Sequence, residues 1–185
     1  EYFADVIKGI IDAKENYGRS DIGKGQKVMV EFVSANPTGP MHMGNARGGV
    51  IGDTLATILS LSGYDVTREF YVNEAGNQID VLSKSLSARY IQLFKGEDAV
   101  PFPEDGYHGD DVKEHVKEYA KLYGDSLLNL SDDERGKKLV EFALKRNIEK
   151  MKSDLEKYKI KYDVWFFESQ LHESGYVEDT VNLLK

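Results

Sequence analysis

The chain has 185 residues, of which 41% are hydrophobic and 30% are charged, the composition of an ordinary globular protein. Its formal net charge of −8 argues against a protein built only to grip nucleic acid, because release of counterions needs a concentrated basic face. No cysteine, signal peptide or run near the roughly 18 apolar residues of a membrane span is present. We therefore expect a cytoplasmic protein without disulfides, thiolate metal sites or membrane contact.

Residues 1–25 are predicted to form an N-terminal helix and a linker. Apolar side chains recur at helical spacing over residues 2–17, and residues 18–25 contain the glycines and aspartate typical of a linker. The chain begins with glutamate instead of methionine, and it stops within another helical pattern at residues 177–184. We therefore expect it to be a piece of a longer protein.

Residues 26–82 are predicted to form a β–α–β unit. Residues 27–33 are mostly apolar and β-branched, as in a covered strand, and residues 65–72 read as a second strand. Between them, residues 46–61 carry apolar side chains at helical spacing and end before Gly63, a natural C-terminal cap. Two strands joined by one helix of this length indicate a right-handed parallel unit.

Glycines at positions 48, 49 and 52 would each weaken this helix by about 1 kcal/mol relative to alanine. Their clustering predicts that the helix packs very closely against the sheet or a ligand.

The loop that enters this helix has the features of a phosphate site. His42 can donate a hydrogen bond to a phosphate oxygen, Gly44 lets a nucleotide approach the backbone, and Asn45 adds an amide donor. A phosphate there would also meet free N–H groups and the positive end of the helix dipole. Such donors suit a reaction in which charge grows on an α-phosphate as pyrophosphate leaves. The alternative is that His42 only caps the helix beside a tight turn.

Residues 83–161 are predicted to form a mainly helical insertion, and residues 162–185 to return to the first domain as a strand and a helix. Ser131 and Glu134 have the spacing of a capping box. The expected elements are helices at 73–94, 110–123 and 132–159, a loop at 95–109 with two prolines, and a strand at 164–167.

These motifs together resemble a known family. The sequence His-Met-Gly-Asn at residues 42–45 is similar to the HIGH signature of class I aminoacyl-tRNA synthetases, with asparagine in place of the final histidine. Further blocks resemble arginyl-tRNA synthetases of the bacterial type: residues 31–40 with 46–49, residues 71–79, and residues 162–166 with 173–175.

The resemblance implies an α/β fold, namely the first half of a Rossmann-like, HIGH-type (HUP) nucleotide-binding fold with parallel strands. The helical insertion would lie near the acceptor end of tRNA, and the second half of the fold would follow residue 185. The implied activity is that of an arginine–tRNA ligase. Such an enzyme activates L-arginine with ATP to arginyl-adenylate and transfers the arginyl group to tRNA(Arg). We expect a monomer, with Mg²⁺ accompanying ATP and no resident metal.

Site residues follow from the same resemblance. Glu31 also stands out by itself, because a carboxylate in an apolar strand is costly to bury unless it is paired, and a substrate guanidinium would pair with it. The alternative is an outward-facing acid on an edge strand. The implied catalytic residues are His42 and Asn45, the ATP-binding residues Pro40, His42, Gly44 and Asn45, and the arginine-binding residues Glu31, Ser34, Asn36 and Gln78.

Other polar and aromatic residues are predicted to be structural. Asn73 is expected to cap the helix that follows it. The three histidines outside the signature, His108, His115 and His172, are expected on the surface and do not have the spacing of a metal pair. Trp165, with its neighbour Phe166, is expected in the core.

Two other functions stay open. A synthetase-like binding or regulatory module without catalysis is compatible with Asn45 and with the missing second half. A small nucleotidylyltransferase uses similar chemistry, but the long helical insertion argues against it. The glycine-rich motifs of dinucleotide dehydrogenases and P-loop kinases do not occur in the sequence.

Overall fold

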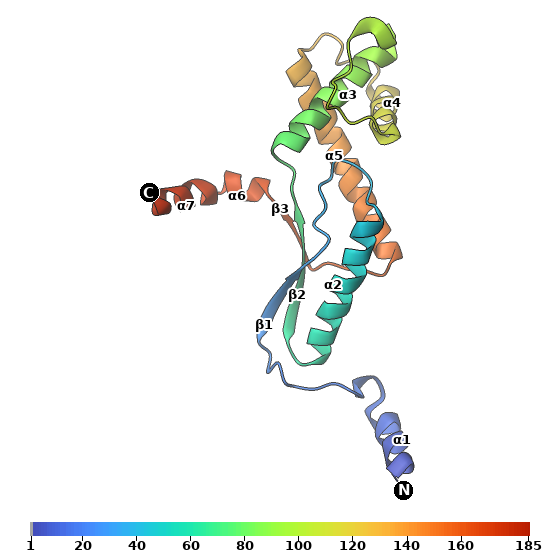
Figure 1. Ribbon diagram of the computed structural model, residues 1–185, viewed down its shortest axis with the longest axis vertical. Helices are drawn as coiled ribbons and strands as arrows, with labels where there is room; N and C mark the ends of the chain where they lie inside the picture. Colours follow the sequence, from blue (N-terminus) through green and yellow to red (C-terminus); the bar gives the residue numbers. More distant parts are fainter. Residues whose placement is uncertain (1) are drawn as a thin grey trace.

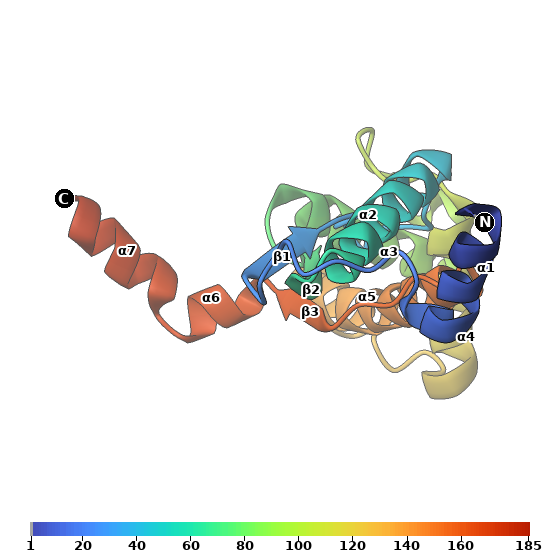
Figure 2. The same cartoon turned by 90° about the horizontal axis from the view of Figure 1, so that it is seen from below.

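The computed structural model describes residues 2–185 and shows an elongated molecule with a small parallel sheet in its middle (Figure 1). A helical unit lies at one end of the sheet, and the first and last helices project away from it (Figures 1 and 2). The elements are α1 Tyr2–Ala13, η1 Lys14–Asn16, β1 Lys27–Glu31, α2 Met43–Leu61, β2 Asp65–Val72, α3 Asn77–Lys95, η2 Glu97–Ala99, α4 Asp110–Tyr123, α5 Asp132–Lys157, β3 Val164–Phe167, α6 Ser169–Glu173 and α7 Tyr176–Leu184.

The sheet has the order β1-β2-β3, and both strand pairs are parallel. β1 pairs with β2 from Lys27 opposite Asp65 to Glu31 opposite Glu69, and β2 pairs with β3 up to Val72 opposite Phe167. The first crossover is α2, and the second is the long segment that contains α3, α4 and α5. The predicted α/β class with parallel strands and a mainly helical insertion is therefore confirmed.

Two separate hydrophobic cores hold the chain together. One lies among α3, α4 and α5 and includes the fully buried Tyr90, Leu86 and Leu139. The other joins one face of the sheet to the C-terminal part of α5, through Phe70 and Leu155. α5 contributes to both cores, so this one helix connects the insertion to the sheet.

The glycines of α2 allow close packing, as predicted. A Cβ atom on Gly52 would lie 2.2 Å from the Cγ atom of Phe32, and one on Gly49 would lie 2.9 Å from Ile160. A Cβ atom on Gly48 would meet nothing within 4 Å. A side chain at position 52 is thus excluded by Phe32 at the end of the first strand, whereas one at position 49 would require the end of the Ile160 side chain to shift.

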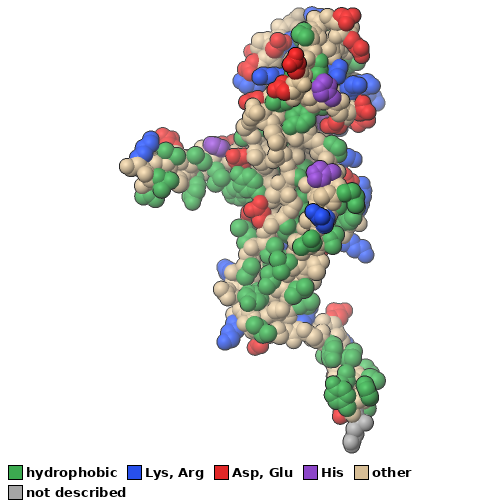
Figure 3. All heavy atoms as spheres, in the orientation of Figure 1, with side chains coloured by type: hydrophobic (Ala, Val, Ile, Leu, Met, Phe, Trp, Pro, Cys, Tyr) green, Lys and Arg blue, Asp and Glu red, His purple; other side chains and the backbone are tan. Residues whose placement is uncertain are grey.

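The opposite face of the sheet is open. Along β1 the side chains alternate between half-buried and exposed, and Met29 is 59% exposed. Apolar side chains also lie exposed on α1 and along α2, and Figure 3 shows hydrophobic side chains on the surface of the middle region and of both projecting arms. No helix among residues 2–185 is long and apolar enough to cross a membrane.

Several predicted boundaries were wrong by a few residues. β1 ends at Glu31 because Val33 and Ser34 have positive φ angles of 68° and 41°, which end the extended conformation. α2 begins three residues earlier than predicted, at Met43. The short helix α6 was not expected.

The prediction that Asn73 caps α3 was also wrong. The helix begins at Asn77, and the capping position is occupied by Gly76, which has a φ of 84°. With its amide turned so that the nitrogen faces the Glu168 carboxylate just after β3, Asn73 would donate to that carboxylate over 2.6 Å. By contrast, the capping box of Ser131 and Glu134 is present. The proposed division of the chain at residues 25, 82 and 161 stays a prediction, and residue 82 lies within α3.

Candidate active site

His42 stands at the N-cap of α2 and forms a reciprocal capping box with Asn45. The backbone N–H of Gly44 donates to the imidazole Nδ1 over 3.1 Å, and the backbone N–H of His42 donates to the Asn45 side-chain oxygen over 3.0 Å. The alternative interpretation of His42 as a helix cap is therefore correct as geometry. It does not compete with the phosphate hypothesis, because an Nδ1 atom that accepts a hydrogen bond leaves the proton on Nε2. Nε2–H is then a donor directed away from the cap.

Gly44 is required by this cap. A Cβ atom at position 44 would lie 2.9 Å from Cε1 and 3.0 Å from Nδ1 of the His42 ring. The sequence suggested that glycine lets a ligand approach the backbone, and the structure provides an intramolecular reason in addition. The Gly44 N–H group is also occupied, so a phosphate at this helix start would interact with the helix dipole and with Nε2–H and not with this N–H group.

A cleft of about 470 Å³ lies beside this helix start. Five of the eight predicted site residues line it, and further lining residues come from the loop before α4, from the first turn of α4 and from α5. The lining residues from the predicted set are Ser34, Asn36, Pro40, His42 and Asn45, and those from the insertion are Tyr107, Gly109, Asp111 and Met151. Sequence reasoning missed the insertion residues because they lie far along the chain and no local motif marks them.

Two of the predicted arginine-binding residues contact each other. The side-chain amide of Asn36 donates to the Gln78 side-chain oxygen over 2.6 Å, although the residues are 42 positions apart. The pair joins the loop after β1 to the first turn of α3. Ser34 is fixed differently, because its hydroxyl oxygen accepts a hydrogen bond from the backbone N–H of Tyr71 in β2 over 3.1 Å.

Glu31 is not buried, contrary to the expectation that it lies in a covered strand. It is exposed at the end of β1, which is an edge strand, and its side chain is on the open face of the sheet. This fits the alternative of an outward-facing acid. Burial raises the pKa of the Tyr71 phenol, and the carboxylates of Glu168 and Glu31 raise it further. Glu31 therefore contributes negative charge to this part of the sheet.

His115 is not a simple surface residue, so that prediction was wrong. It is half-buried, and its Nε2 atom lies 2.9 Å from the Asn147 side-chain oxygen. Its Nδ1 atom is buried without a hydrogen-bond partner. His108 and His172 are exposed, as predicted.

The aromatic pair in β3 divides between the two sides of the sheet. Trp165 stacks on the buried Phe70 with ring centroids 4.4 Å apart, and so packs against the core as predicted. Phe166 is half-buried beside Tyr71, with centroids 5.8 Å apart, and is not part of the core. The alternation of strand side chains accounts for this difference.

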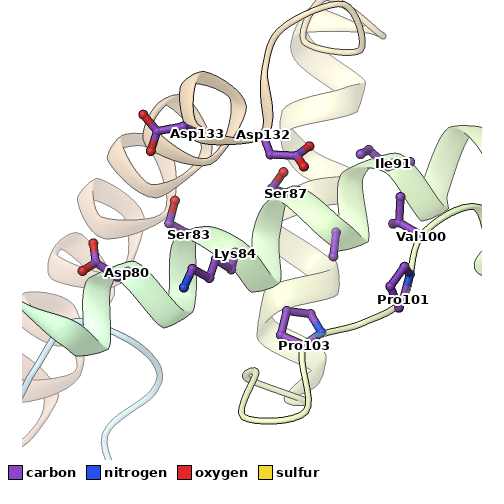
Figure 4. A pocket seen from close by; sticks show the side chains of 11 residues that line it. Asp80, Ser83, Lys84, Ser87, Ile91, Val100, Pro101, Pro103, Asp132 and Asp133 are labelled. Carbon is purple, nitrogen blue, oxygen red and sulfur yellow. The ribbon is translucent and has the colours of Figure 1, made fainter.

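A second cleft, of about 610 Å³, lies within the insertion (Figure 4). It is lined by α3 side chains such as Ser83 and Lys84, by Pro101 and Pro103, and by the first residues of α5. None of the predicted site residues lines it. Three aspartates face a single lysine there, so its charge does not favour a phosphate. We therefore assign the candidate active site to the cleft beside His42.

Parallel strands, a helix start capped by histidine and a cleft beside it are the arrangement of an α/β nucleotide-binding domain. Comparison with known families identifies its class and branch. The family described as "tRNA synthetases class I (R), catalytic domain" matches residues 6–184, and the chain belongs to this family.

Individual relatives agree with this assignment. The chain is 61% identical, over 98% of its length, to an arginine–tRNA ligase of Acetivibrio thermocellus, of which it covers 32%. It is 57% identical over its whole length to an arginine–tRNA ligase of Ruminiclostridium cellulolyticum, of which it covers 33%. The chain thus spans about a third of the length of the curated relatives it matches.

A solved structure from Campylobacter jejuni, described as an arginyl-tRNA synthetase, superimposes with a TM-score of 0.80. Its sequence is 30% identical to this chain, and the match covers 93% of this chain and 37% of that one. The Thermus thermophilus arginyl-tRNA synthetase, 21% identical, shares the fold with a TM-score of 0.57 over 86% of this chain and 26% of that one.

Proposed function

We propose that this chain carries part of the catalytic domain of an arginine–tRNA ligase, which activates L-arginine with ATP and transfers it to tRNA(Arg). The observation that carries the proposal is the His42 cap, whose free Nε2–H group stands at the start of α2 beside a cleft. The family and the names of the relatives support the choice of arginine and tRNA as substrates.

In the first step, a carboxylate oxygen of arginine attacks the α-phosphorus of ATP. The bond to the β-phosphate oxygen breaks, and its electron pair leaves with pyrophosphate. The His42 Nε2–H group and the Asn45 amide would donate to the α-phosphate oxygens as their charge grows, with help from the α2 dipole. A ribose hydroxyl of the tRNA end then attacks the arginyl carbonyl carbon, and AMP leaves. No protein nucleophile is needed, because positioning and charge stabilisation lower the barrier.

We propose that the side chain of the substrate arginine is bound by Glu31, Asn36 and Gln78. A carboxylate can accept two parallel hydrogen bonds from a guanidinium, and the paired amides of Asn36 and Gln78 can add neutral contacts. Glu31 is exposed in these 185 residues, so strong selection for arginine needs a further layer over the open face of the sheet.

Magnesium is assigned to ATP instead of to the protein. Among residues 2–185 there is no group of three or more carboxylate, histidine or cysteine side chains that could hold a metal ion. In the cleft, Asp111 is the one carboxylate among the lining residues. We infer that Mg²⁺ enters on the ATP phosphates, as is usual for this ion. A monomeric state and a cytoplasmic location are part of the same proposal.

The deciding experiment is ATP–pyrophosphate exchange by the full-length gene product with each amino acid in turn, with and without tRNA. We expect exchange with arginine only, and its loss in Glu31→Ala and in His42→Ala. Glu141→Ala, which removes an exposed carboxylate from the insertion, should leave exchange unchanged. Exchange with a different amino acid would keep the class and overturn the substrate. A folded protein without any exchange would favour a non-catalytic binding module.

A further inference from the structure

The loop between β1 and α2 begins in an unfavourable backbone conformation. Val33 has a φ of 68°, in the left-handed region that β-branched residues avoid, and the following Ser34 has a φ of 41°. The backbone N–H of Ser34 donates to the carbonyl of Phe32 over 3.0 Å, which closes a three-residue turn of the rarer, strained kind. Such a conformation persists only when neighbouring groups hold it in place.

Two hydrogen bonds hold the first part of the loop. The Tyr162 hydroxyl donates to the Phe32 carbonyl over 3.0 Å, and the Tyr71 N–H group donates to the Ser34 hydroxyl oxygen over 3.1 Å. Both donors come from the sheet or from the segment that leads into β3. The start of the loop is therefore anchored by the domain to which it belongs.

The middle of the loop is held from the insertion instead. The side-chain amide of Asn147, in α5, donates to the Pro37 carbonyl over 2.8 Å. Within residues 2–185, this is the one side-chain hydrogen bond to the loop backbone between residues 35 and 41. Asn147 is 6% exposed and Pro37 is fully buried, so water does not compete for this bond.

A second residue fixes the direction of the Asn147 amide. Because the amide nitrogen donates to Pro37, its oxygen faces the His115 Nε2 atom at 2.9 Å, and that nitrogen must carry the proton. The other ring nitrogen is buried without a partner, so nothing else orients this imidazole by a hydrogen bond. The contacts form a relay from His115 in α4, through Asn147 in α5, to the loop that carries Asn36 and His42.

We propose that Asn147 is a positioning residue for adenylate formation. By holding the Pro37 carbonyl, it fixes the loop so that Asn36 and His42 are separated by the distance that the reaction needs. His115 supports it by fixing the amide. The consequence for catalysis rests on the proposed function. The contact by which Asn147 holds the loop does not depend on that function. It gives the insertion a direct part in shaping the site where ATP and arginine meet.

The chain offers a matched control. Gln92 in α3 is 8% exposed, its amide nitrogen donates to the Val100 carbonyl over 2.9 Å, and its oxygen accepts from Arg89 over 2.9 Å. Like Asn147, it is a buried amide with one bond to a backbone carbonyl and one to a side chain. It lies wholly within the insertion, so Gln92→Ala removes an equivalent pair of bonds without touching the loop.

We would compare Asn147→Ala, Asn147→Asp and Gln92→Ala in the full-length gene product, below the unfolding temperature of each. Asn147→Asp keeps the shape and can still accept from His115, but the carboxylate cannot donate to Pro37. In both Asn147 variants, the rate of arginine-dependent ATP–pyrophosphate exchange should fall by about 10- to 100-fold, chiefly in kcat, as for a reacting group displaced by about 1 Å. Gln92→Ala should lower the melting temperature and leave the rate of ATP–pyrophosphate exchange unchanged. Equal losses in Asn147→Ala and Gln92→Ala would overturn the proposal.

Hydrogen–deuterium exchange separates this inference from the proposed function. In Asn147→Ala, or in Asn147→Ser should the alanine variant fail to fold, peptides covering residues 33–45 should exchange faster than in the wild type. In Gln92→Ala they should not. Hydrogen–deuterium exchange needs no substrate. The test of the loop therefore remains valid even if the wild-type protein shows no ATP–pyrophosphate exchange with arginine. Unchanged protection of residues 33–45 in the Asn147 variant would refute the positioning role.

Discussion

His42 uses its two ring nitrogens for different purposes. Nδ1 caps the helix by accepting a hydrogen bond from the Gly44 N–H group, and this acceptor role places the proton on Nε2, which we propose donates a hydrogen bond to a phosphate oxygen. The observed helix cap and the proposed catalytic donor are thus the same side chain, and a variant that fails in activity does not by itself show which role was lost.

Replacing His42 by asparagine should separate the two roles. Asparagine is among the best N-cap residues, so His42→Asn should keep the helix start, with little change in melting temperature. It lacks the distal N–H group, and we expect arginine-dependent exchange to fall by about 10²- to 10³-fold, as for loss of one donor to a developing charge. Exchange near the wild-type rate would show that Nε2–H does not act on the phosphate.

Tyr162 predicts a pH dependence of stability. Burial, together with the Asp53 carboxylate, raises the pKa of its phenol far above the ordinary value near 10. The folded protein therefore retains a proton that the unfolded chain releases above about pH 10, and its stability declines as the pH rises past that value. In urea titrations at pH 8 and pH 10.5, the midpoint should fall less between the two pH values for Tyr162→Phe than for the wild type. An equal decline would mean that this phenol is not protected by folding.

At the scale of elements, α2 shows how one helix serves both the sheet and the site. Its glycine-rich face lies against Phe32 and Ile160, while its N-terminus carries His42 and lines the cleft. Close contact at Gly52 therefore sets how far the helix stands from β1, and with it where the helix start lies relative to the loop.

Two alanine substitutions in α2 should have opposite effects. A Cβ atom at Gly52 would overlap the Phe32 ring, so Gly52→Ala should destabilise the protein by about 1–3 kcal/mol, the usual range for overpacking. Gly48 faces open space, and Gly48→Ala should stabilise the helix by about 0.5–1 kcal/mol through helix propensity. Urea unfolding of both variants measures this difference. A Gly52 variant as stable as the Gly48 variant would contradict the close packing.

The whole molecule has an open side. One face of the sheet carries the exposed Met29 and Glu31, and neither α1 nor α7 has a buried residue. Exposed apolar surface of this extent is typical of contact regions. The chain spans about a third of the length of the curated relatives it matches, and Glu31, which we propose binds arginine, is exposed on this open face.

We therefore expect the isolated 185 residues not to charge tRNA. Transfer of radiolabelled arginine to tRNA(Arg) should stay at background for the isolated chain and proceed with the full-length gene product under the same conditions. The physical reason is that an uncovered carboxylate in water discriminates weakly between cations. Robust charging by the short chain would show that these residues form a complete site.

Local pattern by itself determined much of this protein. The strand at residues 65–72, the helix at residues 110–123 and the Ser131 capping box depend on side-chain periodicity and on contacts within a few residues, and all three were predicted correctly. The blocks around residues 31–49 also indicated the family, because the chemistry of a nucleotide site is concentrated in one short loop.

Only the tertiary structure decided how that loop is held and what faces it. The positive φ of Val33, the exposure of Glu31 and the bond from Asn147 to Pro37 all depend on neighbours far along the chain. The part of the cleft lined by Tyr107 and Asp111 depends on how the insertion packs. Periodicity records which face of an element is covered, whereas the partner that covers it is set by packing between distant segments.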